Sequence, residues 1–277
     1  MTGVEDRTPN GSETPGPVQA RFGIQWVDCD IPEATTVMSM PAANLVNPFT
    51  GHPTLSPLAV LVDEAGGMAN FYRHEPGEWA VTSELTIEFS PDAVEIVLNR
   101  PSIPVMARGH AIGPRGRSSL ASCTMTHGTS TIGVGTVRSY FIPFTRVDRE
   151  QCADTSTHAS DATLADLMAV TLAEGTEFSL QQLPDRNVLN PVGSVHGGIG
   201  SAALEVVACA AVNAGRVDAP LHTGSLRVNF LRPFIAGAKS RYVGTAVRVG
   251  RSTAVGDAQA IDDVGKVALT ARVTAYR

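Results

Sequence analysis

The sequence predicts an α+β protein with two similar halves, each a long helix packed against an antiparallel sheet. Three observations predict it: an internal repeat, one long helix-forming segment in each half, and period-two hydrophobic patterns after each helix. The chain has 277 residues, 43% of them hydrophobic, so it is long enough for two domains and apolar enough for a substantial core.

The internal repeat consists of three sets of matching residues that recur in the same order. The segment 41–48 returns at 184–191, and the strand-like segment from Thr82 returns at Thr223. A Gly-Arg-Ser triplet at 116–118 returns at 250–252, so the offset drifts from 143 (184 − 41) through 141 (223 − 82) to 134 (250 − 116). Two copies of one fold with different loop lengths would give this drift. The matches in the first segment are Pro41, Asn44, Asn47 and Pro48 with Pro184, Asn187, Asn190 and Pro191.

This repeat divides the chain into four predicted segments. Residues 1–20, rich in proline and glycine, are expected to form a flexible, disordered tail. The first half spans 21–145, a polar linker spans 146–161, and the second half spans 162–277.

Each half contains one strong helix signal. The first helix follows Ser56-Pro57, a cap residue and a first-turn proline, and runs over 58–70. The second, rich in alanine, runs from about His196 to Val212. Two glycines inside the first helix, Gly66 and Gly67, predict the close approach of another backbone, most simply that of the second helix.

The segments after each helix have the alternation of half-buried strands. Hydrophobic residues occupy every second position over 85–89 and again over 226–230. Segments 118–142 and 240–276 are rich in valine, threonine and tyrosine with glycine-bearing turns, which is typical of an antiparallel meander.

Composition excludes several classes of protein. Lys+Arg is 21 against Asp+Glu 27, a net charge of −6, which argues against a nucleic-acid binder. The four cysteines lack CxxC spacing, so we expect reduced thiols, no metal site and a cytoplasmic protein. No apolar run reaches the length of a membrane span, and the first residues lack the pattern of a signal peptide.

The sharpest motif runs from Asn190 through His196, Gly197 and Gly198 to Glu205. His-Gly-Gly at the start of a helix exposes backbone N–H groups without intrahelical partners, and the glycines let a ligand carbonyl approach them. Such a site suits the oxyanion formed when a thioester or ester is attacked. A glycine-rich turn without any ligand is the alternative.

Carboxylates lie inside both apolar helices: Asp63 and Glu64 in the first, Glu205 in the second. A buried acid needs a partner or a function, although a solvated helix face or an ion pair is the alternative. His196 and Glu205 are separated by roughly 13 Å of helix, too far to act on one carbonyl. Antiparallel packing of the two helices would instead bring the Gly197 end to Asp63 and Glu205 to the loop 47–56.

The chain resembles a known family at these positions. The motif from Asn190 to Glu205, the strand from Thr223 and the later Gly-Arg-Ser are similar to those of hotdog-fold acyl-CoA thioesterases of the phenylacetate-degradation and 4-hydroxybenzoyl-CoA type. The two halves resemble the double-hotdog members, whose tandem hotdog domains form an internal pseudo-dimer. The resemblance covers nearly all residues after 20, but the first half has 51–56 where His-Gly-Gly is expected.

The resemblance implies a role for each matching residue. The Gly197 N–H would bind the oxyanion, Asn190 would orient thioester or water, and the helix carboxylates would attack the thioester or activate water. His196 would fix the loop. Because 51–56 lacks the glycine pair, we predict one working and one degenerate site. The remaining candidates are Glu64 and Asn47 as catalytic residues, His52 as a substitute loop histidine, and Gly198, Thr82 and Thr223 as substrate-binding residues.

Coenzyme A phosphates would need cations. Arg117 and Arg251, in the repeated triplet, are candidates because a guanidinium suits phosphate, although solvated turn arginines are the alternative.

The predicted function is therefore hydrolysis of an acyl-CoA thioester. No separate cofactor is expected, because coenzyme A is part of the substrate, and a homo-oligomer is compatible with the internal pair. Two alternatives stay open: a hotdog 2-enoyl-CoA hydratase or dehydratase, and a catalytically silent acyl-CoA-binding protein.

Overall fold

The structure, a computed structural model, describes residues 15–42, 45–144, 162–173, 175, 177–216 and 218–277. The elements of the first half are α1 (Pro17–Phe22), β1 (Gln25–Asp30), β2 (Thr35–Met40), α2 (Leu58–Phe71), β3 (Glu78–Phe89), α3 (Ala93–Leu98), β4 (Val105–Ile112), β5 (Ser118–His127) and β6 (Ser130–Pro143). Those of the second half are α4 (Leu164–Met168), β7 (Val170–Leu172), β8 (Ser179–Gln182), the 3₁₀ turn η1 (Arg186–Val188), α5 (Gly197–Val212), β9 (His222–Phe230), β10 (Arg241–Val249), β11 (Thr253–Ile261) and β12 (Val267–Tyr276).

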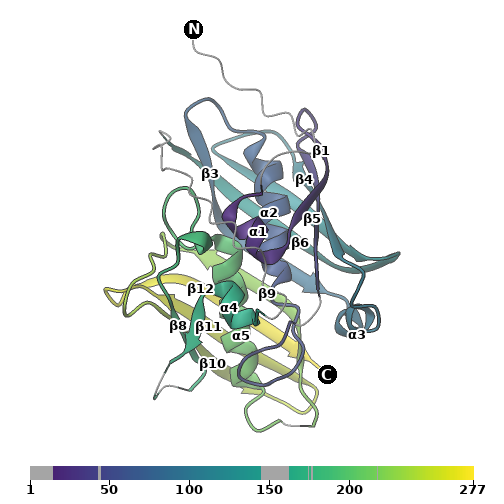
Figure 1. Cartoon of the computed structure of the whole chain (residues 1–277), viewed down its shortest axis with the longest axis vertical. Coiled ribbons are helices and arrows are strands. Elements are labelled where there is room, and N and C mark those ends of the chain that lie inside the picture. Colours follow the sequence, from purple (N-terminus) through teal and green to yellow (C-terminus); the bar gives the residue numbers. More distant parts are fainter. Residues whose placement is uncertain (1–14, 43–44, 145–161, 174, 176, 217) are drawn as a thin grey trace.

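The described strands form one sheet whose order is symmetric about its centre. The order is β1-β2-β4-β5-β6-β3-β9-β12-β11-β10-β8-β7, so the second half repeats the first in mirror order. Every pairing is antiparallel. In Figure 1 the first-half strands curve around α2 and the second-half strands around α5. The predicted α+β architecture, a helix against an antiparallel sheet done twice, is confirmed.

The two halves are joined by strand pairing at the centre of the sheet. β3 and β9 pair from Glu84 opposite Asn229 to Glu88 opposite Ser225. These are the two segments in which the sequence shows period-two patterns. The buried side chains of Leu85 and Ile87 therefore continue the same apolar layer as those of the second half.

The two long helices, α2 and α5, pack against the curved sheet and against each other. Residues Gly198–Val212 of α5 are all buried, which explains its alanine-rich sequence. The close helix crossing lies at Gly198, where an added Cβ would sit 2.5 Å from the Cα of Val60 in α2. The expectation that Gly66 and Gly67 make this crossing is wrong. A Cβ on Gly66 would meet the Val137 side chain of β6 at 2.7 Å, and one on Gly67 would meet nothing within 4 Å.

The predicted flexible tail over 1–20 is wrong for its last residues. Pro17–Phe22 form α1, which buries Val18 and Phe22 and ends at Gly23 in a left-handed conformation. Two apolar residues four positions apart share one helix face, so even this short helix can join the core. Residues 1–14 and the predicted linker 146–161 lie outside the described residues.

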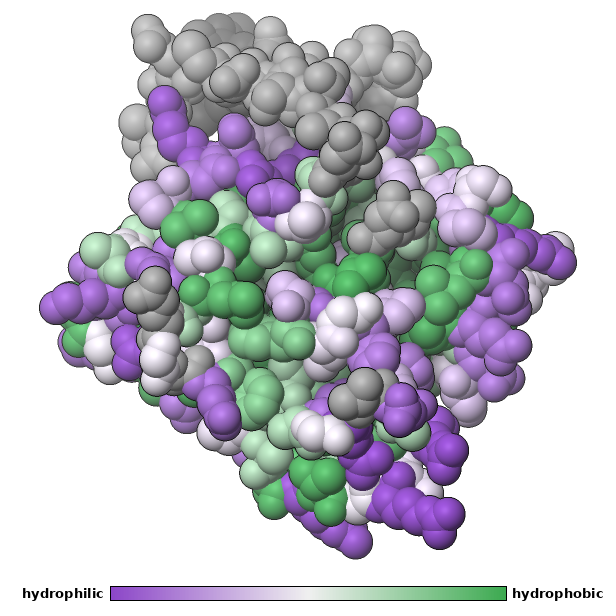
Figure 2. Space-filling model, turned by 60° about the horizontal axis from the view of Figure 1, so that its bottom comes forward, coloured by the Kyte–Doolittle hydropathy of each residue, from purple (hydrophilic) through white to green (hydrophobic). Residues whose placement is uncertain are grey.

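Hydrophobic and hydrophilic side chains both lie on the surface. On the face drawn in Figure 2, hydrophobic residues reach the surface near its centre, and hydrophilic residues dominate its lateral edges. Apolar side chains such as those of Val27, Tyr140 and Val264 are half or more exposed, as is common on folded proteins. Within the described ranges, no helix combines the length and apolar character that crossing a membrane requires.

Candidate active site

Asp63 of α2 faces the N-terminus of α5. Its Oδ2 accepts a hydrogen bond from the backbone N–H of Gly198 at 2.6 Å, and its Oδ1 accepts one from the Thr82 hydroxyl of β3 at 2.8 Å. The residue is 6% exposed. A helix N-terminus favours an anion because its first N–H groups lack intrahelical partners and the helix dipole is positive there. The structure thus brings together the residues that antiparallel packing of the helices predicts.

His196 precedes α5 and lies between the two carboxylates of α2. Its Nε2 is 3.2 Å from Glu64 Oε1, and its Nδ1 accepts the Gly198 N–H at 3.2 Å. In the neutral ring, Nε2–H therefore donates to Glu64. Protonation would place an Nδ1–H against Asp63 Oδ2, which is 3.5 Å away. The imidazole is thereby held by contacts at both nitrogens.

The electrostatic environment separates the two adjacent acids. Burial raises the pKa of Asp63, and the charge of His196 and the Thr82 hydrogen bond offset only part of this effect. Burial also acts to raise the pKa of Glu64, but the hydrogen bond and charge of His196 and a hydrogen bond from Gln19 lower it overall. Burial acts to lower the pKa of His196, but Glu64 and Asp63 act more strongly in the opposite direction, so the pKa of His196 is raised overall. These shifts favour the charged forms of Glu64 and His196, and Asp63 is the acid better suited to accept a proton.

Gly197 lies directly against the Asp63 carboxylate, where only a residue without a side chain fits. An added Cβ would lie 2.8 Å from Asp63 Oδ2 and 3.2 Å from Cε1 of Phe230, a residue at the end of β9. Gly197 is partly exposed, and its N–H has no partner within the part of the chain that the structure describes. A carbonyl oxygen could therefore approach this N–H within reach of the carboxylate.

Glu205 of α5 faces the loop before α2, as Asp63 of α2 faces the N-terminus of α5. The hydroxyl of Thr223 donates to its Oε1, and that of Thr54 donates to its Oε2 at 3.4 Å. The Ser56 N–H donates to Thr54 Oγ1 at 3.1 Å, as the Gly198 N–H does to His196. Thr54 thus occupies the place of the histidine.

The surroundings of Glu205 are closed. Leu55 and Ser56 stand where the second half has its two glycines, and the cavity beside Glu205 has a volume of about 20 Å³. That space holds about one water molecule. Burial raises the pKa of Glu205 to about 7, with hydrogen bonds from Thr223 and Thr54 offsetting part of the effect.

Loop length decides between Asp63 and Glu64 as the counterpart of Glu205. Isolated bridges from Val46 to Pro53 and from Leu189 to Val195 close equivalent loops, the first of which is one residue longer. Counting onward from these bridges aligns Asp63 with Glu205 and leaves Glu64 as the next residue. His52 precedes its bridge and lines the small cavity beside Glu205, so it does not replace His196.

Among the described residues, the side chains of the two predicted asparagines form no hydrogen bond with Asp63 or Glu205. Asn190 closes its own loop, because its side chain donates to Ser194 Oγ at 2.8 Å and accepts the Ser194 N–H at 3.0 Å. Asn47 instead donates to the carbonyl of Val206 in α5 at 3.0 Å. Both asparagines therefore stabilise loops in this structure, and the role of Asn190 toward substrate stays a prediction.

The remaining predicted binding residues fall into two groups. Gly198, Thr82 and Thr223 use their hydrogen bonds on Asp63 or Glu205, so the structure places them as partners of the carboxylates. Arg117 and Arg251 are exposed in the turns before β5 and β11. Their contact with coenzyme A stays a prediction.

Three residues of these sites escaped the sequence reasoning. Gln19 lies in the segment interpreted as a tail, although Val18 and Phe22, four apart after a proline, are the signal of a short helix. The extra loop residue hides the correspondence of Thr54 with His196, and the alternation over 226–230 indicates only that Phe230 belongs to a strand.

The structure has two long helices, each surrounded by the strands of its own half and each with an acid that faces the other half. This is the arrangement of a double-hotdog protein. Known structures show the same double-hotdog arrangement over nearly the whole chain. In addition, residues 186–276 match the family described as the acyl-CoA thioesterase N-terminal domain. The second half is therefore similar in sequence to this thioesterase domain.

Similar solved structures support the fold. The tesB protein of Mycobacterium avium subsp. paratuberculosis superposes with a TM-score of 0.58 at 14% identity, covering 94% of this chain and 97% of that chain. An acyl-CoA thioesterase II, TesB2, from Mycobacterium marinum gives 0.55 at 10% identity, with the same two coverages of 94% and 97%. The 12:0-ACP thioesterase from Umbellularia californica gives 0.54 at 10% identity, covering 87% and 92%. No curated protein sequence matches the chain.

Proposed function

We propose that the protein hydrolyses acyl-CoA thioesters at one site per chain, with Asp63 from the first half and the first turn of α5 from the second. The observation that supports this most directly is the Asp63 carboxylate held against the Gly198 N–H, next to the partly exposed Gly197. The family match of residues 186–276 supports the same substrate class.

The geometry suggests how the reaction proceeds. The thioester carbonyl oxygen accepts the Gly197 N–H, which stabilises the oxyanion as it forms. Asp63, ionised and with a raised pKa, removes a proton from water as the water oxygen attacks the carbonyl carbon. The C–S bond then breaks, and coenzyme A leaves as a thiol with that proton. The acyl group remains open, and the phenylacetyl or 4-hydroxybenzoyl type is the first candidate to assay.

The geometry favours hydrolysis over hydration of an enoyl thioester. A hydratase would need a histidine free to exchange a proton with the acyl carbons or with water. Both ring nitrogens of His196 are engaged, with Gly198 and with Glu64, and its side chain is 15% exposed. Asp63 is instead the acid that lies against Gly197.

The test is thiol release from a panel of aromatic and linear acyl-CoAs by the wild type, Asp63→Asn and Glu205→Gln. We expect Asp63→Asn to lose at least about 10²-fold in kcat, the usual contribution of a general base, and to keep coenzyme A binding by calorimetry. Glu205→Gln should keep its turnover because its side is closed. A wild type that binds acyl-CoA without releasing thiol would instead be a binding protein, and an active Asp63→Asn would contradict the assigned base.

A further inference from the structure

The segment before β1 reaches the active site through one side chain. Gln19 of α1 donates from Nε2 to Glu64 Oε2 at 3.0 Å, while its Oε1 accepts the backbone N–H of Gly16 at 3.1 Å. Both polar ends of the amide are therefore fixed. Glu64 in turn uses its other oxygen for His196 Nε2 at 3.2 Å.

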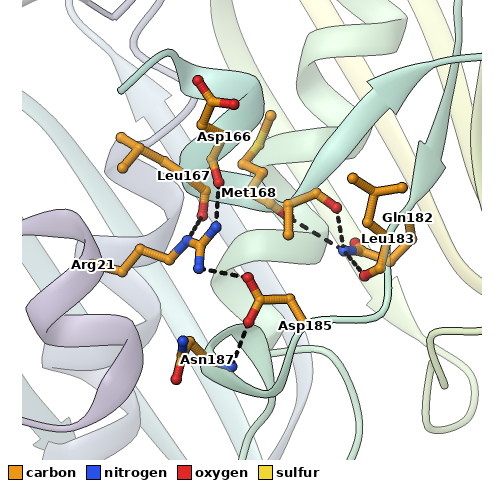
Figure 3. Close-up of polar contacts among 9 residues, drawn as sticks. Arg21, Asp166, Leu167, Met168, Gln182, Leu183, Asp185 and Asn187 are labelled. Atoms are coloured by element: carbon orange, nitrogen blue, oxygen red, sulfur yellow. Dashed lines mark hydrogen bonds and ion pairs between the residues drawn. The ribbon is translucent and has the colours of Figure 1, made fainter. Parts of the chain in front are cut away.

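α1 is anchored to the opposite half of the protein. Arg21 donates to the carbonyls of Leu167, at 2.7 Å, and of Asp166, and forms an ion pair with Asp185 at 2.6 Å. Figure 3 shows this guanidinium reaching from α1 to the end of α4 and to η1. Together with the buried Val18 and Phe22, these contacts hold α1 as a short strap between the first-half helix α2 and the second half.

We propose that Gln19 is a positioning residue, which holds the Glu64 carboxylate toward His196 and so keeps the imidazole in place beside Gly198 and Asp63. The inference rests on the proposed hydrolase for its effect on turnover, but the contact itself does not depend on it. Gln19 touches neither Asp63 nor the space beside Gly197, so it acts through Glu64 and His196.

Removing Gln19 has a defined electrostatic consequence. Among the described residues, the titratable groups that interact with Glu64 are His196 and Asp63, and Gln19 adds a hydrogen bond that lowers the pKa of Glu64. Without that bond the Glu64 carboxylate is free to turn away from His196, so it stabilises the protonated imidazole less. A less charged His196 lowers the pKa of Asp63 less, and the acid limb of kcat/KM should move to higher pH.

The experiment compares the wild type with Gln19→Ala, Gln19→Glu and Gln181→Ala. Gln181, on β8, also makes a side-chain hydrogen bond, to the Ala238 carbonyl at 2.8 Å, and is the matched control. For each variant, thermal melting tests folding, NMR of labelled histidine gives the pKa of His196, and thiol release gives the kcat/KM profile. His196→Asn identifies the His196 signal among the seven histidines of the chain.

We expect the pKa of His196 to fall by about half a unit or more in Gln19→Ala, and kcat/KM on the acid limb to fall about threefold or more at equal Tm. Gln19→Glu should keep the contact only at low pH, where its carboxyl is protonated, and should lose activity more steeply as the pH rises. Gln181→Ala should match the wild type.

An unchanged His196 pKa in a folded Gln19→Ala, or in Gln19→Glu should the first not fold, would overturn the assignment. A wild type without thiol release but with the expected fall in the His196 pKa would overturn the hydrolase and keep the positioning role.

Discussion

The buried acid of the closed site makes a prediction about stability. Glu205 is 1% exposed, and its pKa rises from 4.5 to about 7 on folding. A group whose folded pKa is raised contributes stability below its unfolded pKa, and that stability is lost as the pH rises through the folded value. Glu205→Gln keeps the shape and one acceptor oxygen for Thr223, but it has no proton to lose.

The magnitude follows from the two pKa values. The difference of about 2.5 (7 − 4.5), at 1.36 kcal/mol per pKa unit, corresponds to about 3 kcal/mol in total. Most of that change falls between pH 5 and pH 8, so the free energy of unfolding of Glu205→Gln relative to the wild type should rise by about 2.5 kcal/mol over this range.

The assay is urea unfolding followed by circular dichroism at several pH values. Taking the difference between variant and wild type cancels the groups that titrate in both. Glu84→Gln serves as the control, since that side chain is half exposed and pairs with Arg138 at the surface. Its difference from the wild type should not change over this range. Parallel curves for wild type and Glu205→Gln, or a wild type that gains relative stability with pH, would refute the reasoning.

Two further predictions concern the helix crossing at Gly198 and the hydrogen bonds of Asp63. Gly198→Ala should lower the free energy of unfolding by about 1–3 kcal/mol, because its Cβ would overlap the backbone at Val60. Gly67→Ala, which has open space around it, should instead raise the free energy of unfolding by about 0.5–1 kcal/mol. Chemical unfolding of both variants measures the difference. Equal effects would contradict the helix crossing. Thr82→Val removes a hydrogen bond that lowers the pKa of Asp63, so the acid limb of kcat/KM should move to higher pH; an unmoved limb in the pH profile would separate Asp63 from the rate.

Much of the architecture was predictable because its signals are local. Period-two hydrophobic residues at Leu85 and Leu226 mark the two strands next to the central seam, and His196 marks the start of α5. The contact between Asp63 and the N-terminus of α5 was predictable from the length of α5. His196 and Glu205 lie too far apart along this helix to act on one carbonyl, so the acid has to come from the other helix.

The rest depends on contacts between residues far apart in the sequence. α1 is held by Arg21 bonding to residues more than 140 positions away, which no local pattern reveals. Gly66 proved to pack against the sheet, because a glycine shows that something is close without showing what. The Asn190 side chain turned into its own loop, where Ser194 offered both a donor and an acceptor.

The two halves that meet at the β3–β9 seam are encoded separately, so the two sites can change independently. In a dimer of identical chains every substitution appears at both symmetry-related positions, so losing a glycine at one active site means losing it at the other. Here the two copies are successive stretches of a single polypeptide. One side can therefore have Leu55 and Ser56 while the other has Gly197 and Gly198. Covalent fusion thus allows one copy to specialise as scaffold, and a single codon change can be assigned to a single site.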